Sequence, residues 1–212
     1  MAGRRHLRII GALGLAFGLS ACGAVETVSR AMPLGLGPAG AGATPAAAAP
    51  ALVARDYRLT DVIVTVPGEL TVSEANGYIP AADIVWRGDP LGDRKAQIAA
   101  IIKTAFETGA GYLDGPRPVI AEIEIRRWHS ITERARYTTG GLHNIDFLLT
   151  IRDAATGAVL EGPRMVDADL PALGGQAAIR AEQSGMGQKV RLTTHLGMIA
   201  RQELTGMVPA RF

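Results

Sequence analysis

The feature that most limits how this chain can fold is an uncharged stretch from 33 to 54, which reads PLGLGPAGAGATPAAAAPALVA. It contains four prolines and four glycines. Proline interrupts a helix, and alanine buries too little surface to offset the entropy that is lost when the chain is ordered. We therefore expect 22–54 to be a flexible tether, so that the folded domain is confined to 55–212.

The first 21 residues have the pattern of a secretory signal peptide. Arg4, Arg5 and Arg8 precede an apolar run at 9–19, which is too short to span a bilayer as a helix, since that takes about 20 residues. Without 1–21 the chain keeps 19 of its 22 basic residues and all 20 acidic ones, so the net charge changes from +2 to −1. A chain so close to neutral is not expected to bind nucleic acid, because such proteins carry a clustered basic excess.

The signal ends in a short motif that points to a membrane anchor. Leu19-Ser20-Ala21-Cys22 resembles the lipobox of bacterial lipoproteins, in which a leucine and two small residues precede the cysteine that is lipidated. The resemblance implies a lipid anchor on Cys22, with acyl chains such as palmitate, and a place on the periplasmic face of the cell envelope. Gly23 replaces the aspartate of the familiar inner-membrane retention signal, which favours the outer membrane.

An ordinary cleaved signal beside an unmodified cysteine is the alternative to a lipobox. That cleavage needs a small residue two positions before Ala21, and Leu19 stands there instead. The alternative therefore fits the sequence less well than lipidation of Cys22 does.

Periodicity within 55–212 predicts an α+β domain. Each expected strand and helix has one apolar face, so we predict an antiparallel sheet of about four strands with two helices packed on one face. Asp89 and Pro90 look like the N-cap and first residue of the first helix, and 131–142 and 170–188 read as loops. The expected strands are 57–66, 83–87, 118–130, 143–152 and 158–167, and the expected helices are 90–109 and 189–205.

The order of these elements, together with the lipobox, resembles small envelope-assembly lipoproteins. Examples are the lipoprotein that plugs the lipopolysaccharide-assembly barrel and the curli-export and Tol-type periplasmic domains. The segments 25–30 (VETVSR) and 86–94 (WRGDPLGDR) resemble an uncharacterised family of small alphaproteobacterial lipoproteins, which has no activity to carry over.

These resemblances imply a non-catalytic assembly or adaptor factor for an outer-membrane or envelope complex, with an envelope protein as partner. Two other functions stay open at the level of the sequence. One is an auxiliary subunit of an export or lipid-transport system. The other is a hydrolase that acts on envelope material.

Few residues in the sequence point to chemistry. The single cysteine excludes an internal disulfide and a cysteine-rich zinc site, and neither a phosphate-binding glycine motif nor an HExxH motif is present. His129 and His143 could face each other across a hairpin and bind a metal, but polar residues at strand ends are the simpler explanation of both. We predict no catalytic residue, no metal and no cofactor.

One cluster of basic and aromatic residues is a candidate site for an anion or a partner. Guanidinium groups bind phosphate and carboxylate in bidentate fashion, so the cluster could contact an acidic protein, an anionic lipid or lipopolysaccharide. The alternative is a charged, solvated hairpin that protects a sheet edge. The cluster comprises Arg126, Arg127, Trp128, His129, Arg134, Arg136 and Tyr137.

We expect the mature protein to begin at Cys22 and to carry a diacylglycerol on its sulfur, because the thiol is the nucleophile that the lipobox presents. Mass spectrometry of the N-terminal peptide from membrane extracts checks this. Cys22→Ala should abolish both the added mass and the membrane attachment, since two or more acyl chains provide the stable anchor. A mature N-terminal cysteine of unmodified mass would contradict the prediction.

Overall fold

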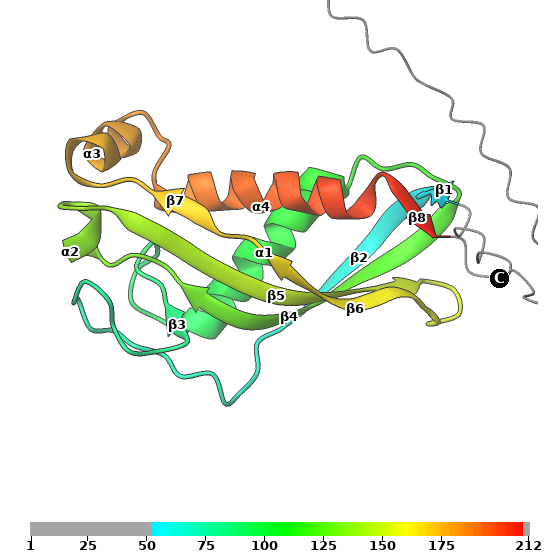
Figure 1. Ribbon diagram of the computed structural model, residues 1–212, viewed down its shortest axis with the longest axis horizontal. Helices are drawn as coiled ribbons and strands as arrows, with labels where there is room; N and C mark the ends of the chain where they lie inside the picture. Colours follow the sequence, from blue (N-terminus) through cyan, green and yellow to red (C-terminus); the bar gives the residue numbers. More distant parts are fainter. Residues whose placement is uncertain (1–51, 210–212) are drawn as a thin grey trace, which may run out of the picture. The chain divides into compact units, whose positions relative to one another are not determined.

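The computed structural model describes residues 52–209 as a mixed α+β domain (Figure 1). The signal, Cys22 and most of the predicted tether lie outside the described residues. In chain order the elements are β1 (Leu52–Ala54), β2 (Tyr57–Thr65), β3 (Ile84–Val85), α1 (Arg94–Ala110), β4 (Arg117–His129), α2 (Glu133–Arg136), β5 (Gly141–Asp153), β6 (Val159–Asp167), β7 (Leu170–Ala172), α3 (Gly175–Gln183), α4 (Gln188–Leu204) and β8 (Met207–Pro209).

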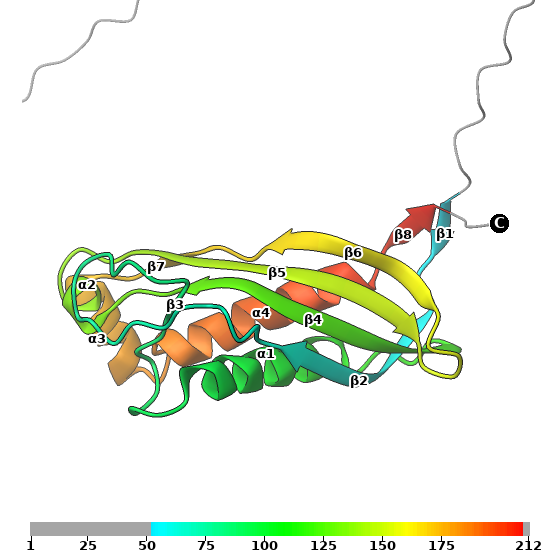
Figure 2. The same cartoon turned by 90° about the horizontal axis from the view of Figure 1, so that it is seen from below.

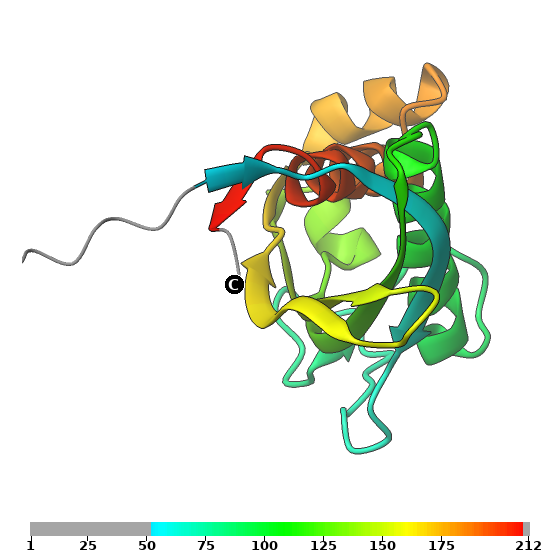
Figure 3. The same cartoon turned by 90° about the vertical axis from the view of Figure 1, so that its right-hand side faces the viewer.

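The centre of the domain is the antiparallel pair β4 and β5, each of 13 residues. They lie within a six-stranded sheet in the order β2-β4-β5-β6, to which β3 and β7 add short pairings. Seen from its end, the sheet is strongly curved from β6 round to β2 (Figure 3). Of the expected strands, all five are present in the described part of the chain, with ends shifted by a few residues.

The sheet is mixed, so the prediction of a purely antiparallel sheet is wrong. Strand β2 pairs with β4 in parallel, with Leu59 opposite Val119 and Thr65 opposite Glu124, and β3 also pairs with β4 in parallel. The reason is α1, which follows β2 and β3 and returns the chain to the end of the sheet from which β2 began. A helical crossover of this kind joins neighbouring strands that run the same way.

The two long helices, α1 and α4, pack against one face of this sheet, as predicted (Figure 2). The rings of Phe106 in α1 and Phe147 in β5 meet edge to face, with their centroids 6.0 Å apart. Burial of the large aliphatic and aromatic side chains between the helices and the sheet supplies most of the stabilisation of the folded domain, at about 1.5–3 kcal/mol for each side chain. The sheet contributes Val119, Ala121, Ile123, Ile125, Ile145, Phe147, Leu149 and Ile151, and the helices contribute Ile98, Ile101, Ile102, Ala105, Phe106, Leu192, Leu196, Ala200 and Leu204.

Helix α1 begins later than predicted. Its N-cap is Asp93, whose carboxylate accepts a hydrogen bond from the backbone N–H of Ala96 at 3.0 Å. Asp89, the predicted cap, instead accepts from Trp86 Nε1 at 2.8 Å and from Lys189 Nζ at 2.7 Å. Both aspartates suit a helix start locally, and the tertiary contacts of Asp89 decide between them.

Several short elements lie where the sequence suggested loops or tether. Helices α2 and α3 and strand β7 fall within the predicted loops, and β1 occupies the last three residues of the predicted tether. Helix α3 has nine residues and buries Ala178 alone of them, so it is a short element at the surface. Strand β1 forms by pairing with β8, about 150 residues further along the chain, and a local pattern cannot reveal such a partner.

The chain enters the domain through a buried ionic contact. Arg55 Nε and Nη2 donate to the two carboxylate oxygens of Glu161, each at 2.8 Å, and the Tyr57 hydroxyl donates to the same carboxylate at 2.7 Å. These bonds hold the pKa of Glu161 below its ordinary value, although its burial acts in the opposite direction. Burial and the bond to Glu161 raise the pKa of Tyr57 to about 12. The start of β2 is thereby joined to β6 across the curved sheet.

Within residues 52–209, no helix combines the length and the apolar character that crossing a membrane requires.

Helices α1 and α4 touch backbone to backbone at one crossing. A Cβ atom added to Gly109 in α1 would lie 2.1 Å from the carbonyl oxygen of Gly197 in α4. A Cβ on Gly197 would in turn lie 3.2 Å from the carbonyl oxygen of Ala105. Glycine at both positions is therefore what allows the two helices to cover the same sheet face so closely.

We expect Gly109→Ala to lower the free energy of unfolding by about 2 kcal/mol, because overpacking the crossing outweighs the better helix propensity of alanine. Urea denaturation measures the change. The matched control is Gly68→Ala, since a Cβ at Gly68 meets no atom within 4 Å. Equal destabilisation by the two substitutions would contradict the importance of the crossing.

Candidate functional site

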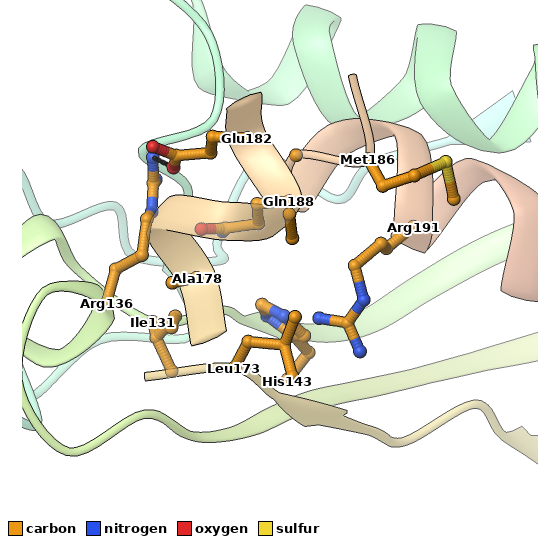
Figure 4. Close-up of a pocket in the computed structure, with 11 residues that line it drawn as sticks. Ile131, Arg136, His143, Leu173, Ala178, Glu182, Met186, Gln188 and Arg191 are labelled. Carbon is orange, nitrogen blue, oxygen red and sulfur yellow. Dashed lines mark hydrogen bonds and ion pairs between the residues drawn. The ribbon is translucent and has the colours of Figure 1, made fainter. Parts of the chain in front are cut away.

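A pocket lies between α3, the start of α4 and the start of β5 (Figure 4). It is at the end of the domain opposite to β1 and β8 (Figure 1). Its cavity volume is about 10 Å³, which is space for about one water molecule. Its polar lining residues are Arg136, His143, Glu182, Gln188 and Arg191, and its apolar ones are Ile131, Leu173, Ala178, Ala181 and Met186.

A hydrogen-bonded series of buried side chains forms one wall of the pocket. Gln188 Nε2 donates to Ser130 Oγ at 2.5 Å, and Ser130 Oγ lies 2.7 Å from Nδ1 of His143. A hydroxyl group can donate one hydrogen bond and accept two, so Ser130 can bond to Gln188 and to either tautomer of His143. Ser130 and His143 are each 1% exposed and Gln188 is 8% exposed.

The imidazole of His143 is neutral at physiological pH. Burial and the nearby positive groups of Arg191, Arg136 and His195 lower the pKa of His143 to about 3. A general base is most effective when its pKa lies near the operating pH. The Ser130–His143 pair is therefore poorly suited to activate a serine nucleophile.

The two arginines of the pocket have different partners. Arg136 Nη1 donates to Glu182 at 3.2 Å and its Nη2 donates to the carbonyl oxygen of Arg87 at 2.9 Å. Arg191 Nη2 donates to the carbonyl oxygen of Pro171 at 3.0 Å, and among residues 52–209 no carboxylate oxygen lies within 4.0 Å of its guanidinium. With one glutamate against two arginines, the lining carries a net charge of +1.

The start of α4 adds to this positive field. Its N-cap is Gly187, which has no side chain to accept from the first backbone N–H groups, and its first turn contains no acidic residue. The N-terminus of a helix carries a partial positive charge of roughly half an elementary charge. Gly187 and Gln188, which line the pocket, place this end of α4 against it.

The predicted basic and aromatic cluster is divided by the fold. Trp128 is fully buried and meets Trp86 edge to face, with their ring centroids 5.8 Å apart. His129 is 9% exposed, and its Nε2 lies 2.8 Å from the carbonyl oxygen of Pro80. Burial removes Trp128 from any surface contact, whereas His129 lines a hollow at the α2 end of the domain. The cause is a bulge after Ile125, which adds one residue to β4 and turns Trp128 inward against the expected alternation.

The five other members of the cluster lie in separate places. Arg126 is exposed on β4 and pairs with Glu124 at 2.9 Å, and Arg127 lies opposite Asp146 of β5. Arg134, at α2, stacks over the ring of Tyr78, 4.6 Å from its centroid. Arg136 lines the pocket, while the Tyr137 hydroxyl donates to Glu182 at 3.2 Å. Cys22, the predicted lipidation site, lies outside the described residues.

The residues that could hold a cation were missed at the level of the sequence. One carboxylate oxygen from each of Asp146, Asp167 and Asp169 lies within 4.8 Å of the others. Burial and the charges of Asp169 and Asp167 raise the pKa of Asp146, while nearby Arg127 opposes the rise. In the sequence, only the spacing of Asp167 and Asp169 at the end of a strand pointed to this cluster. Asp146 is distant in sequence and reaches them only through the pairing of β5 with β6.

A second hollow lies beside the pocket at the α2 end of the domain. Its volume is about 660 Å³, including the open part, and residues from β4, α2 and the start of β5 line it. Three large side chains stand exposed around it, namely Tyr78 at 47%, Ile79 at 85% and Leu142 at 47%. This end of the domain therefore presents apolar surface to solvent.

Comparison with known proteins places the chain in a family whose function is unknown. Residues 57–211 match a family described as "Family of unknown function (DUF6778)". No curated protein matches the chain.

Solved structures show faint likenesses. A "putative lipoprotein" from Caulobacter crescentus is 16% identical over 50% of this chain and 79% of its own, with a TM-score of 0.32. Protein XCC0632 from Xanthomonas campestris, of family DUF330, is 16% identical over 76% of this chain and 92% of its own, with a TM-score of 0.38. PelC from Paraburkholderia phytofirmans is 13% identical over 69% of this chain and 95% of its own, with a TM-score of 0.27. Likenesses this faint carry no argument about function.

We expect the stability difference between the native protein and His143→Gln to depend on pH. As the pH falls from about 6.5 towards 3, the unfolded native chain binds a proton on His143 and the folded chain does not. The native protein should lose up to about 1.4 kcal/mol per pH unit relative to the variant. Urea denaturation of both proteins at several pH values checks this, since their other titrating groups are shared. A difference that is independent of pH would contradict the burial of a neutral His143.

Proposed function

Since this chain belongs to DUF6778, a family of unknown function, we propose a function from its own residues. We propose that it is a lipid-anchored, non-catalytic protein of the bacterial cell envelope that serves as an assembly or adaptor factor. The anchor is a lipid on Cys22, the domain stands on the periplasmic face, and Gly23 favours the outer membrane over the inner one.

The observation that carries this proposal is the N-terminal sequence. Three arginines, an apolar run of signal length and the motif Leu19-Ser20-Ala21-Cys22 occur in the order that lipoprotein export requires. These features are independent of one another, and each is needed for lipidation. The uncharged residues from 33 to 51 then supply the spacer between the lipid and the domain.

The character of the pocket supports a binding role over catalysis. Its one serine and histidine pair is 1% exposed, and the pKa of His143 is about 3. Among the described residues, no carboxylate bonds to His143 to complete a nucleophilic triad. The ring of His143 is a buried, neutral polar group that is held in place by its hydrogen bond with Ser130.

The shape of the domain separates the end at which the chain would be anchored from the end that would contact a partner. The described chain begins at β1, beside β8, and α2 and the start of β5 lie at the opposite end of the domain (Figure 1). The exposed residues Tyr78, Ile79 and Leu142 line the hollow together with residues of these two elements. Thirteen strand residues extend about 40 Å. A domain held at β1 by its tether would present this apolar end to a protein partner, with Arg134 beside Tyr78 for an acidic group.

We expect Ile79→Glu to abolish recovery of the envelope partner when the protein is affinity-purified from detergent-solubilised envelopes and its partners are identified by mass spectrometry. A charge there opposes burial of the apolar surface in an interface. Leu91→Glu is the matched control, because Leu91 is 80% exposed and does not line the hollow.

Recovery of the same partner with Ile79→Glu and with the native protein would refute docking at this end. Release of the native protein from membranes without detergent would refute the anchor itself. The two results are separable, because one concerns a surface of the folded domain and the other concerns the lipid on Cys22.

A further inference from the structure

We propose that the end of the domain that carries β1 and β8 rests on the surface of a lipid bilayer. The contact residues are Leu52 and Val53 of β1, Met207 of β8 and Tyr112 in the loop after α1, and together they form the ribbon patch. The proposal rests on the proposed anchoring of the chain by a lipid on Cys22. It adds how the anchored domain stands relative to the membrane.

The ribbon of β1 and β8 lies outside the main sheet. Its three residue pairs run antiparallel, from Leu52 opposite Pro209 to Ala54 opposite Met207, and neither strand belongs to the six-stranded sheet. All three residues of β1 are exposed, with Leu52 at 58%, and Met207 is 56% exposed. A ribbon of two strands is only marginally stable in water, and large apolar side chains that gather at a surface mark contact sites.

Tyr112 and Arg201 extend this surface with groups that suit the headgroup layer of a membrane. The loop that holds Tyr112 lies against the chain just after β1, since a Cβ on Gly115 would lie 2.3 Å from the backbone of Asp56. Tyr112 is 55% exposed, and the guanidinium of Arg201 in α4 lies over its ring, 5.2 Å from the centroid. Among residues 52–209, no carboxylate oxygen lies within 4.0 Å of Arg201. Tyrosine and arginine both place an apolar stem in the bilayer and a polar tip among the headgroups.

The position of the ribbon patch favours a membrane over a free protein as its partner. The described chain begins at Leu52, and residues 23–51 join it to the proposed lipid on Cys22. As the flexible tether that the sequence predicts, this segment would have a root-mean-square length of about 30 Å. So short a link keeps the ribbon patch at a high effective concentration next to the bilayer, and burial of a few apolar side chains is then enough for contact.

The contact would fix the direction in which the anchored domain points. Strands β1 and β8 lie at one end of the domain and α2 lies at the other (Figures 1 and 2). With the ribbon patch on the bilayer, the hollow around Ile79 would face away from the membrane. A tether alone would leave the domain free to turn.

The test uses the full chain, expressed with its own signal, purified in detergent and reconstituted into vesicles of phosphatidylethanolamine and phosphatidylglycerol. Trp86 and Trp128 are fully buried, so a tryptophan placed at the surface is a separate fluorescence reporter. Leu52→Trp places it in the ribbon patch. Leu91→Trp is the matched control, because Leu91 is 80% exposed and precedes α1 at the end opposite to Tyr112. Lipids with brominated acyl chains quench a tryptophan that enters the bilayer.

We expect brominated lipid to quench Leu52→Trp at least about twofold more than Leu91→Trp, because only the ribbon patch enters the bilayer. Adding Met207→Asp should remove most of this difference, since a charge opposes burial in lipid. Adding Met165→Asp should not, because Met165 is 58% exposed on β6 and lies outside the ribbon patch. Thermal unfolding confirms that each variant is folded.

Equal quenching of the two tryptophan reporters would overturn the contact. A blue shift of the Leu52→Trp emission that grows with the ratio of protein to lipid, without quenching, would show that a second copy covers the ribbon patch and would also overturn it.

The anchor and the contact can fail separately in this experiment. The mass of the N-terminal peptide reports on the lipid on Cys22, whereas quenching reports on the ribbon patch. A lipidated protein that floats with the vesicles but shows no excess quenching of Leu52→Trp overturns the contact and leaves the anchor standing. An unlipidated protein that floats and is quenched refutes the anchor and supports the contact.

Discussion

The rest of the structure depends on the antiparallel pairing of β4 with β5. The two strands pair from Val119 to His129 and bury the same face, on which Ile123 and Leu149 lie opposite each other. A single sheet cannot bury a continuous apolar face by itself, so helices must cover it. Helices α1 and α4 do so, and they fit because Gly109 and Gly197 let their backbones touch.

The length of this strand pair also separates the two ends of the domain. At one end, the contact of Arg55 and Tyr57 with Glu161 joins the entry of the chain to the sheet. At the other end, the start of α4 contacts the ends of these strands. Gln188, the first residue of α4, donates to Ser130, which in turn is hydrogen-bonded to His143 of β5. A rigid strand pair thus keeps the proposed attachment of the protein and its candidate binding site far apart.

Regular patterns in the sequence predicted the regular parts of the structure. The alternation in 118–130 and 143–152 and the apolar stripes of the two long helices follow from local geometry, because side chains repeat every two residues in a strand and about every 3.6 in a helix. The direction of β2 could not be predicted in this way, since it depends on the crossover through α1. The bulge after Ile125 likewise moved Trp128 from the expected surface into the core.

By itself, the sequence determined the two long strands and the two long helices, and it predicts a signal peptide and a lipobox at Cys22. It could not determine the pocket, because Ser130, His143 and Gln188 come from three separate segments and meet only when α4 packs at the end of the sheet. The tertiary structure also decided which arginines remain available, since Arg136 is paired with Glu182 and Arg191 has no acidic partner among the residues described. Local periodicity reports which face a side chain occupies, whereas charge pairing and burial depend on contacts between distant segments.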